Sequence, residues 1–324
     1  MLEDTTILKI DNKPFIPTKL IHKLFFNSKM KVLKFLIILL IPIICSCDDD
    51  HDKNPADYEL YISISSDKYP SISPDGTQIA FYHKCIQDKQ SAIYPTGLYI
   101  QNMDGTNKRL LIEGDHFNPD WSPDCKWITF SSAGVLRIIN VKGDSIRTFN
   151  GLDNALHSPD WSMDGEKIIV SAPLRIDGGV FEISPDFLSI KRILNPITNN
   201  GMYASWSPDR SKIVYIKGSK SLKSVEIFTS DTALLFEKQL TSDNRDDRSP
   251  KWSPDGGRIT WSSNVIVMIM DIEGENRKSL DFGNNPSWSP NSDYIIYSNA
   301  NIDFTKEVLW KINIDGSERT QLTY

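Results

Sequence analysis

The sequence of 324 residues carries a net charge of −6, with 24% charged residues and no basic patch. A nucleic-acid partner is therefore not expected, because proteins that bind phosphate backbones cluster Lys and Arg on one face. The length suits one repeat domain better than two separate domains.

The chain up to residue 46 has the features of an export signal. Lys31 and Lys34 precede an apolar run at 35–44, which is too short to span a bilayer and has the length of a signal-peptide core. We interpret 30–46 as a lipoprotein signal peptide and Met30 as the true start. Residues 1–29 are then a non-native or mis-assigned leader. The alternative is a long n-region that is removed with the signal.

A pair of cysteines ends the signal-peptide core. Cys47 closes the run Ile-Cys-Ser-Cys, which resembles a bacterial lipobox, whereas Cys45 lacks the small residue expected before it. We expect Cys47 to be acylated and 47–57 to form an acidic tether. The acids here also mimic an EF-hand loop, but Lys53 stands where that loop needs Gly. The expected location is the bacterial cell envelope, lipid-anchored in the outer membrane on its periplasmic or surface face.

One phrase recurs six times after the tether, at intervals of 36 to 49 residues, and this spacing is typical of solenoids and propellers. Its form is Trp-Ser-Pro-Asp-Gly, with Ile in place of Trp in the first copy. The six copies begin at Ile72, Trp121, Trp161, Trp206, Trp252 and Trp288. Pro, Asp and Gly favour a tight turn, and Gly accepts a positive φ there. Cys125, Arg210 and Ser292 replace this Gly, so their turns must tolerate a positive φ or change type.

Each copy of the phrase is followed by segments typical of short strands. An alternating strand such as 128–130 comes next, then a strand such as 135–138, a hairpin and an outer strand. Four strands per unit predict an all-β fold, a six-bladed β-propeller of four-stranded antiparallel blades over 58–324. The Trp residues are expected between neighbouring blades. Residues 58–64 are a candidate outer strand that closes the ring with the last blade.

The repeated phrase, the second strand and the Asp-Gly hairpin together resemble the TolB-type (WD40-like, PD40) propeller repeat. The match covers about 58–324, and its repetition makes it specific. TolB itself carries an extra α/β domain before its propeller, for which this chain has no room, so the chain resembles a lipoprotein variant rather than TolB proper. The same repeat occurs in propellers fused to peptidases and in some lyases, so the resemblance does not fix an activity.

The connections that precede the first strands carry the candidate binding residues. In a propeller these connections meet at one mouth of the central channel, where binding tends to reside. The candidate ligand-binding residues are His116, His157, Asp247, Arg248 and Asn284. A metal or acidic ligand held by the His residues is one interpretation. Polar loop residues in water are the other, because two or three His without fixed spacing are a weak metal signal.

Two classes of function follow from these features. The first is a non-enzymatic envelope lipoprotein that binds or scaffolds a protein or glycan, with no catalytic residue, no metal and no cofactor. The alternative is a carbohydrate-active enzyme, a metal-dependent lyase-like propeller. We favour the first, because the sequence holds no G-x-S-x-G, no H-E-x-x-H and no phosphate-binding Gly loop.

Overall fold

The described part of the chain consists of β-strands and their connections. The structure, a computed structural model, describes residues 65–85, 94–151, 156–172, 179–194, 202–218, 224–232, 235–243, 245–302 and 306–324. Over these ranges, no helix has the length and apolar character needed to cross a membrane. The expected signal peptide, Cys47, the acidic tether and the strand at 58–64 lie outside them. The all-β class is confirmed for the described residues.

Sixteen of the described strands form four separate sheets, each made of four consecutive antiparallel strands. The first sheet comprises β5 (Phe117–Trp121), β6 (Trp127–Ser132), β7 (Val135–Asn140) and β8 (Ile146–Thr148). The second comprises β9 (His157–Trp161), β10 (Ile168–Ala172), β11 (Gly179–Ile183) and β12 (Ile190–Leu194). The third comprises β13 (Met202–Trp206), β14 (Lys212–Gly218), β15 (Val225–Asp231) and β16 (Glu237–Gln239). The fourth comprises β17 (Asp247–Trp252), β18 (Arg258–Ser263), β19 (Ile266–Asp271) and β20 (Lys278–Phe282).

The two ends of the repeat region share one eight-stranded sheet. Its N-terminal strands are β1 (Ser66–Ile72), β2 (Gln78–Lys84), β3 (Gly97–Asn102) and β4 (Arg109–Glu113). Its C-terminal strands are β21 (Asn284–Trp288), β22 (Tyr294–Ala300), β23 (Glu307–Asn313) and β24 (Thr320–Gln321). A parallel pairing of β1 with β23, at Ser66 and Glu307, joins the two groups. The prediction of a propeller with six separate antiparallel blades is therefore wrong: four four-stranded sheets stand alone, and the other strands form one sheet with a parallel step.

The short last strand explains this joined sheet. β24 has two residues and pairs with β23 only at Trp310 and Lys311, so the start of β23 keeps an open edge. An open strand edge pairs readily with another strand. The backbone N–H of Glu307 donates to the carbonyl of Ser65 at 3.2 Å, and Lys68 Nζ lies 2.9 Å from Glu307 Oε2.

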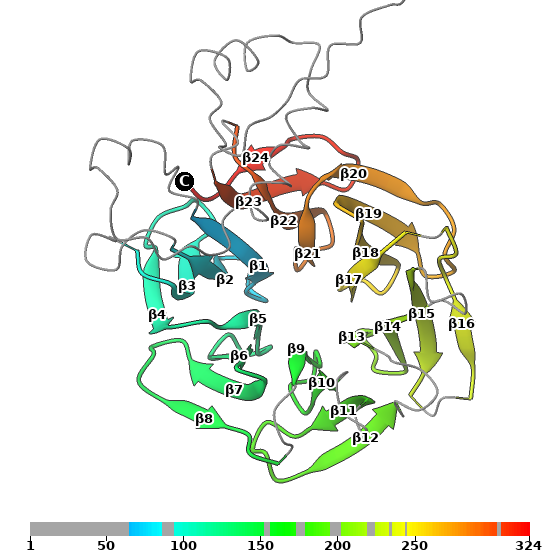
Figure 1. The fold of residues 1–324 in the computed structure, drawn as a ribbon, viewed down its shortest axis with the longest axis horizontal. Helices are drawn as coiled ribbons and strands as arrows, with labels where there is room; N and C mark the ends of the chain where they lie inside the picture. Colours follow the sequence, from blue (N-terminus) through cyan, green and yellow to red (C-terminus); the bar gives the residue numbers. More distant parts are fainter. Residues whose placement is uncertain are drawn as a thin grey trace, which may run out of the picture. The chain divides into compact units, whose positions relative to one another are not determined.

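The sheets are arranged radially around a central axis (Figure 1). The first strand of each repeat lies nearest the centre, while β4, β8, β12, β16 and β20 lie at the rim. The residue that precedes each repeat's Trp therefore comes from the innermost strand, and the central channel is built from six such strands.

The prediction that the Trp residues lie between sheets is confirmed. Trp206 packs against Ile169 and Val180 of the preceding sheet and against Ile213 and Tyr215 of its own. No single sheet could cover both of its apolar faces, so each repeat depends on its neighbours for burial. The Trp residues that are buried in this way are Trp121, Trp206, Trp252 and Trp288.

The repeated turn has the same hydrogen bonds in successive copies. In one of them, Ser122 Oγ donates to Asp124 Oδ1 at 2.6 Å and accepts the backbone N–H of Trp127 at 2.9 Å. These bonds hold the turn without help from the rest of the fold. The copies that lack Gly keep the same turn type, because Cys125, Arg210 and Ser292 adopt φ values of 58°, 59° and 61°.

Candidate functional site: a constricted central channel

A ring of six residues in a strained backbone conformation surrounds one mouth of the channel. Each lies three residues before the first residue of its repeat phrase, where the pairing of the first and second strands shifts register. All have φ between 51° and 53°, a conformation that residues other than Gly adopt at a cost. A hollow of about 50 Å³ lies within the ring. The ring residues are Tyr69, Asn118, Ser158, Tyr203, Ser249 and Asn285.

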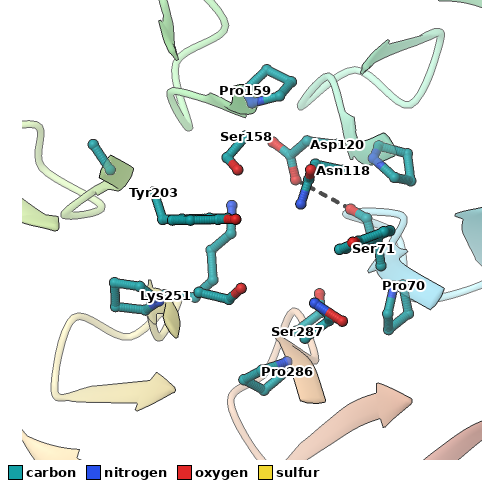
Figure 2. Close-up of a pocket in the computed structure, with 16 residues that line it drawn as sticks. Pro70, Ser71, Asn118, Asp120, Ser158, Pro159, Tyr203, Lys251, Pro286 and Ser287 are labelled. Carbon is teal, nitrogen blue, oxygen red and sulfur yellow. Dashed lines mark hydrogen bonds between the residues drawn. The ribbon is translucent and has the colours of Figure 1, made fainter. Parts of the chain in front are cut away.

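A layer of polar and charged side chains lies deeper, contributed by the residue immediately before each Trp or Ile. Figure 2 shows Lys251 extending into the hollow toward Ser158, with Asp120 and Ser71 joined by a hydrogen bond beside it. Lys251 Nζ forms an ion pair with Asp160, which belongs to a sheet two repeats earlier in the chain. The layer consists of Ser71, Asp120, Asp160, Ser205, Lys251 and Ser287.

The two acidic side chains of this layer also bind the backbone of the next sheet. Asp120 Oδ2 accepts the N–H of Trp161 at 2.8 Å, and Asp160 Oδ2 accepts the N–H of Trp206 at 3.0 Å. Asp120 also accepts a hydrogen bond at its Oδ1, from Ser71 Oγ at 3.2 Å. Each carboxylate is therefore fixed between two neighbouring repeats, and both are held close to Lys251.

The electrostatics of the layer follow from its confinement. Burial raises the pKa of Asp120 to about 7; Lys251 acts to lower this pKa, and Asp160 raises it further. Burial alone would lower the pKa of the Lys251 ammonium, but Asp160 and Asp120 reverse this effect and the pKa is raised. Lys251 is therefore charged at neutral pH and lies as the cation of a triad with Asp120 and Asp160.

A second, wider hollow of about 260 Å³ lies on the other side of this layer. Its wall includes the repeat Trp residues and the Pro residues of the turns, with Met163 where the third turn lacks Pro. Ser71, Asp120, Lys251 and Ser287 line both hollows. The charged layer therefore divides the channel into a narrow mouth, here called the polar mouth after the Asn and Ser residues of its ring, and a wider funnel on the other side.

Three of the predicted binding residues occupy equivalent places at the polar mouth. His157, Arg248 and Asn284 each lie four residues before the repeat Trp, next to the strained ring. Arg248 is exposed, with Asp246 Oδ2 3.9 Å from its guanidinium. His157 and Asn284 are half-buried, and burial lowers the pKa of His157. Among the described residues, no hydrogen bond or ion pair joins these three side chains to one another.

The other two predicted residues, His116 and Asp247, lie one position earlier and are buried. His116 is 4% exposed, its Nε2 lies 3.0 Å from the carbonyl oxygen of Glu113, and its ring packs edge-on against Phe130. Burial lowers its pKa. His116 is thus a core residue, and the alternative of a polar loop residue in water is wrong for it. Asp247 is fully buried and accepts a hydrogen bond from Trp261 Nε1 at 3.0 Å.

The charged triad of the channel was not among the residues predicted from sequence. Asp120, Asp160 and Lys251 each precede a repeat Trp, which is a position on the strand and not in the connection before it. A signal was present: these positions face the axis in a propeller, and in this chain half of them are charged while the others are Ser.

The radial sheets and the channel they enclose define this protein as a β-propeller of repeated four-stranded units. The model of the TolB β-propeller domain family, PD40, matches residues 76–324, and the chain belongs to that family. The resemblance seen in the sequence is thereby confirmed.

Curated relatives cover different shares of the chain. It is 28% identical over 213 residues to the uncharacterized peptidase YuxL of Bacillus subtilis, a match that covers 60% of this chain but 29% of the peptidase. It is 25% identical over 258 residues to the uncharacterized protein Atu1656 of Agrobacterium fabrum, covering 76% of this chain and 74% of that protein. The chain thus spans less than a third of the first relative, a named peptidase.

Two solved structures share the fold. TolB from Acinetobacter baumannii superposes with a TM-score of 0.63 at 21% identity, over 76% of this chain and 63% of TolB. An oligogalacturonate lyase from Vibrio parahaemolyticus superposes with a TM-score of 0.54 at 10% identity, over 81% of this chain and 78% of the lyase. At these identities the likeness concerns fold alone.

Proposed function

We propose that this protein is a cell-envelope lipoprotein whose propeller binds a protein or glycan partner at the polar mouth of the channel. The observation that carries the proposal is the ring of six residues with left-handed φ values around a hollow lined by Lys251, which pairs with Asp160. Strained backbone gathers where a fold positions groups for a ligand. The hollow is shallow, so the ligand would lie across the mouth, with Arg248 and His157 at its edge.

A binding role fits the state of the ionisable groups better than catalysis does. The two channel carboxylates accept backbone N–H groups and lie beside Lys251, so neither is placed to act freely as a base. A lyase of the kind considered above needs several His ligands near one another. Within the described ranges, His83 is bonded to Asp67 at 2.6 Å and His116 lies against the carbonyl of Glu113, away from a shared site.

Site-specific photocrosslinking in cells tests the binding surface. A photoreactive amino acid in place of Arg248 or His157 is expected to give a crosslinked species. The same amino acid in place of Lys238, an exposed residue of the rim strand β16, should not. Crosslinking from the rim with equal yield, or none from the mouth, would contradict a partner at the channel. A covalent species that resists protease would point to a glycan.

Acylation of Cys47 is a separate prediction, and it tests whether the protein carries a lipid anchor. Growth with a clickable palmitate analogue should label the wild-type protein and the Cys45→Ala variant, because the lipobox-like run ends at Cys47. Labelling should disappear in Cys47→Ala. Equal labelling of all three proteins would rule out lipid attachment at this residue.

A further inference from the structure

Three carboxylates meet where the chain passes from the third four-stranded sheet to the fourth. Glu226 lies on β15, Asp243 in the connection that follows β16, and Asp247 at the start of β17. One oxygen from each lies within 4.8 Å of one oxygen of the others. In the part of the chain that the structure describes, this is the one such group of potential metal ligands.

Two of these carboxylates are buried and incompletely satisfied. Glu226 is 1% exposed and Asp247 is 0% exposed, and neither Glu226 Oε2 nor Asp247 Oδ2 has a hydrogen-bond partner in the described structure. The other oxygens are bonded, Glu226 Oε1 by Ser224 Oγ at 2.6 Å and Asp247 Oδ1 by Trp261 Nε1 at 3.0 Å. A buried carboxylate oxygen without a partner is costly, so two such carboxylates in one group point to a missing cation.

The equivalent positions of other repeats show that Glu226 replaces an apolar residue. In β15 the N–H of Ile227 donates to Thr241 Oγ1 at 2.8 Å, and in β23 the N–H of Leu309 donates to Thr323 Oγ1 at 2.9 Å. The two strands therefore align with Glu226 at the place of Val308, which is buried in the core. A charge at a core position needs compensation that Val does not.

Asp247 lacks the ring partner that the equivalent residue of the first repeat has. Asp67 occupies its place in the first repeat, opposite His83 on β2, and His83 Nδ1 lies 2.6 Å from Asp67 Oδ1. On β18 the residue opposite Asp247 is Ser263, whose buried hydroxyl also lacks a partner. Ser supplies neither the ring nitrogen nor much of the volume of His.

The surrounding groups compensate only a small part of the negative charge. Arg245 Nε lies 3.9 Å from Asp243 Oδ2, and both side chains are more than 40% exposed. The exposed side of Asp243 leaves an entry path from solvent.

We propose that Glu226, Asp243 and Asp247 bind a hard divalent cation, Ca²⁺, that ties β15 to the start of β17. The group offers oxygen ligands only, which hard cations prefer, and neither His nor Cys belongs to it. Ca²⁺ takes about six to eight oxygen ligands at about 2.3 to 2.6 Å in adaptable geometry, and oxygens within 4.8 Å of one another can share such an ion. Mg²⁺ demands near-ideal octahedral geometry and keeps several of its waters, so a partly buried set of carboxylates favours Ca²⁺. The cation lies one residue from Arg248 and would hold that edge of the polar mouth.

Calorimetric titration of the full chain with CaCl₂, after dialysis against EDTA, tests this assignment. We expect one saturable site in the wild type. Glu226→Gln and Asp247→Asn keep size and hydrogen-bonding capacity, and each should weaken Ca²⁺ binding at least tenfold. Asp67→Asn is the matched control, a buried carboxylate at the equivalent place of another repeat, and it should bind like the wild type. Asp243→Asn, at a solvent-exposed side chain, serves if a buried substitution prevents folding.

Thermal unfolding gives a second readout. Ca²⁺ at a hundredfold excess over its Kd should raise the wild-type Tm by about 5 to 10 °C, and the shift should vanish in Glu226→Gln. In EDTA that variant should melt at or above the wild type, because buried like charges are removed. Absence of saturable binding, binding kept by both variants, or equal binding of Mg²⁺ would overturn the assignment. A higher Tm for Glu226→Gln, together with no Ca²⁺-dependent change of Tm in the wild type, would also overturn the assignment. The carboxylates would then share a proton and not a cation.

Discussion

Trp206→Ala is expected to lower the free energy of unfolding by about 3 to 5 kcal/mol, the usual cost of truncating a buried aromatic side chain. Trp206 is 5% exposed, and its ring fills the space between Ile169 and Val180 of one sheet and Ile213 of the next. Both sheets are fixed by their other neighbours in the ring, so they cannot close on the cavity. Chemical denaturation followed by circular dichroism measures the change.

Met163→Ala is the control for this experiment. Met163 lies in the turn of the preceding copy of the repeated phrase, and it is 55% exposed. Its truncation should change the free energy of unfolding by less than about 0.5 kcal/mol. A loss below about 1 kcal/mol for Trp206→Ala would contradict a position between packed sheets.

The repeat itself could be predicted from sequence because its determinants are local. Ser122 and Asp124 bond to each other and to the following backbone, so the turn is encoded within a few residues. The Trp residues that precede the turn pack between sheets for the same reason, since alternation along a strand sets the side on which a side chain lies. Cys125 shows that the turn survives without Gly, at the cost of a strained φ of 58°.

The features that sequence did not predict depend on distant parts of the chain. The pairing of β1 with β23 arises because β24 is too short to cover Glu307, which no local pattern encodes. His116 lies directly before β5, whereas His157 is the first residue of β9, and this offset of one residue places His116 in the core against Phe130. Asp120 and Lys251 meet across the channel although 131 positions separate them in the sequence, so their coupling becomes visible only once the ring is closed.

Lys251→Met is expected to lower the free energy of unfolding by about 2 to 4 kcal/mol at pH 8, because it leaves two confined carboxylates without their cation. The loss is set below that of a fully buried pair, because the Lys251 side chain is 31% exposed and the channel water screens the charges. Asp160 loses its ion pair, and Asp120 loses the charge that opposes the rise of its pKa.

The same substitution should cost less at pH 5 than at pH 8. Burial raises the pKa of Asp120 to about 7 in the folded protein, above the value of about 3.9 expected in the unfolded chain. The folded state therefore binds this proton more tightly, and this contribution to stability falls as pH rises from about 4 to about 7. Without Lys251 the folded pKa rises further, so the fall continues above pH 7. Urea unfolding at both pH values measures the difference.

Two further variants separate the charge effect from lost packing. Adding Asp120→Asn and Asp160→Asn to Lys251→Met removes the unpaired charges, so most of the lost stability at pH 8 should return and the pH dependence should flatten. Lys126→Met, at a Lys that is 74% exposed and 3.4 Å from Asp124, should change stability by less than about 0.5 kcal/mol. If Lys251→Met costs as little as Lys126→Met, or costs more at pH 5 than at pH 8, then the ammonium does not hold the channel carboxylates. The layer that divides the channel would then depend on the backbone bonds of Asp120 and Asp160 alone.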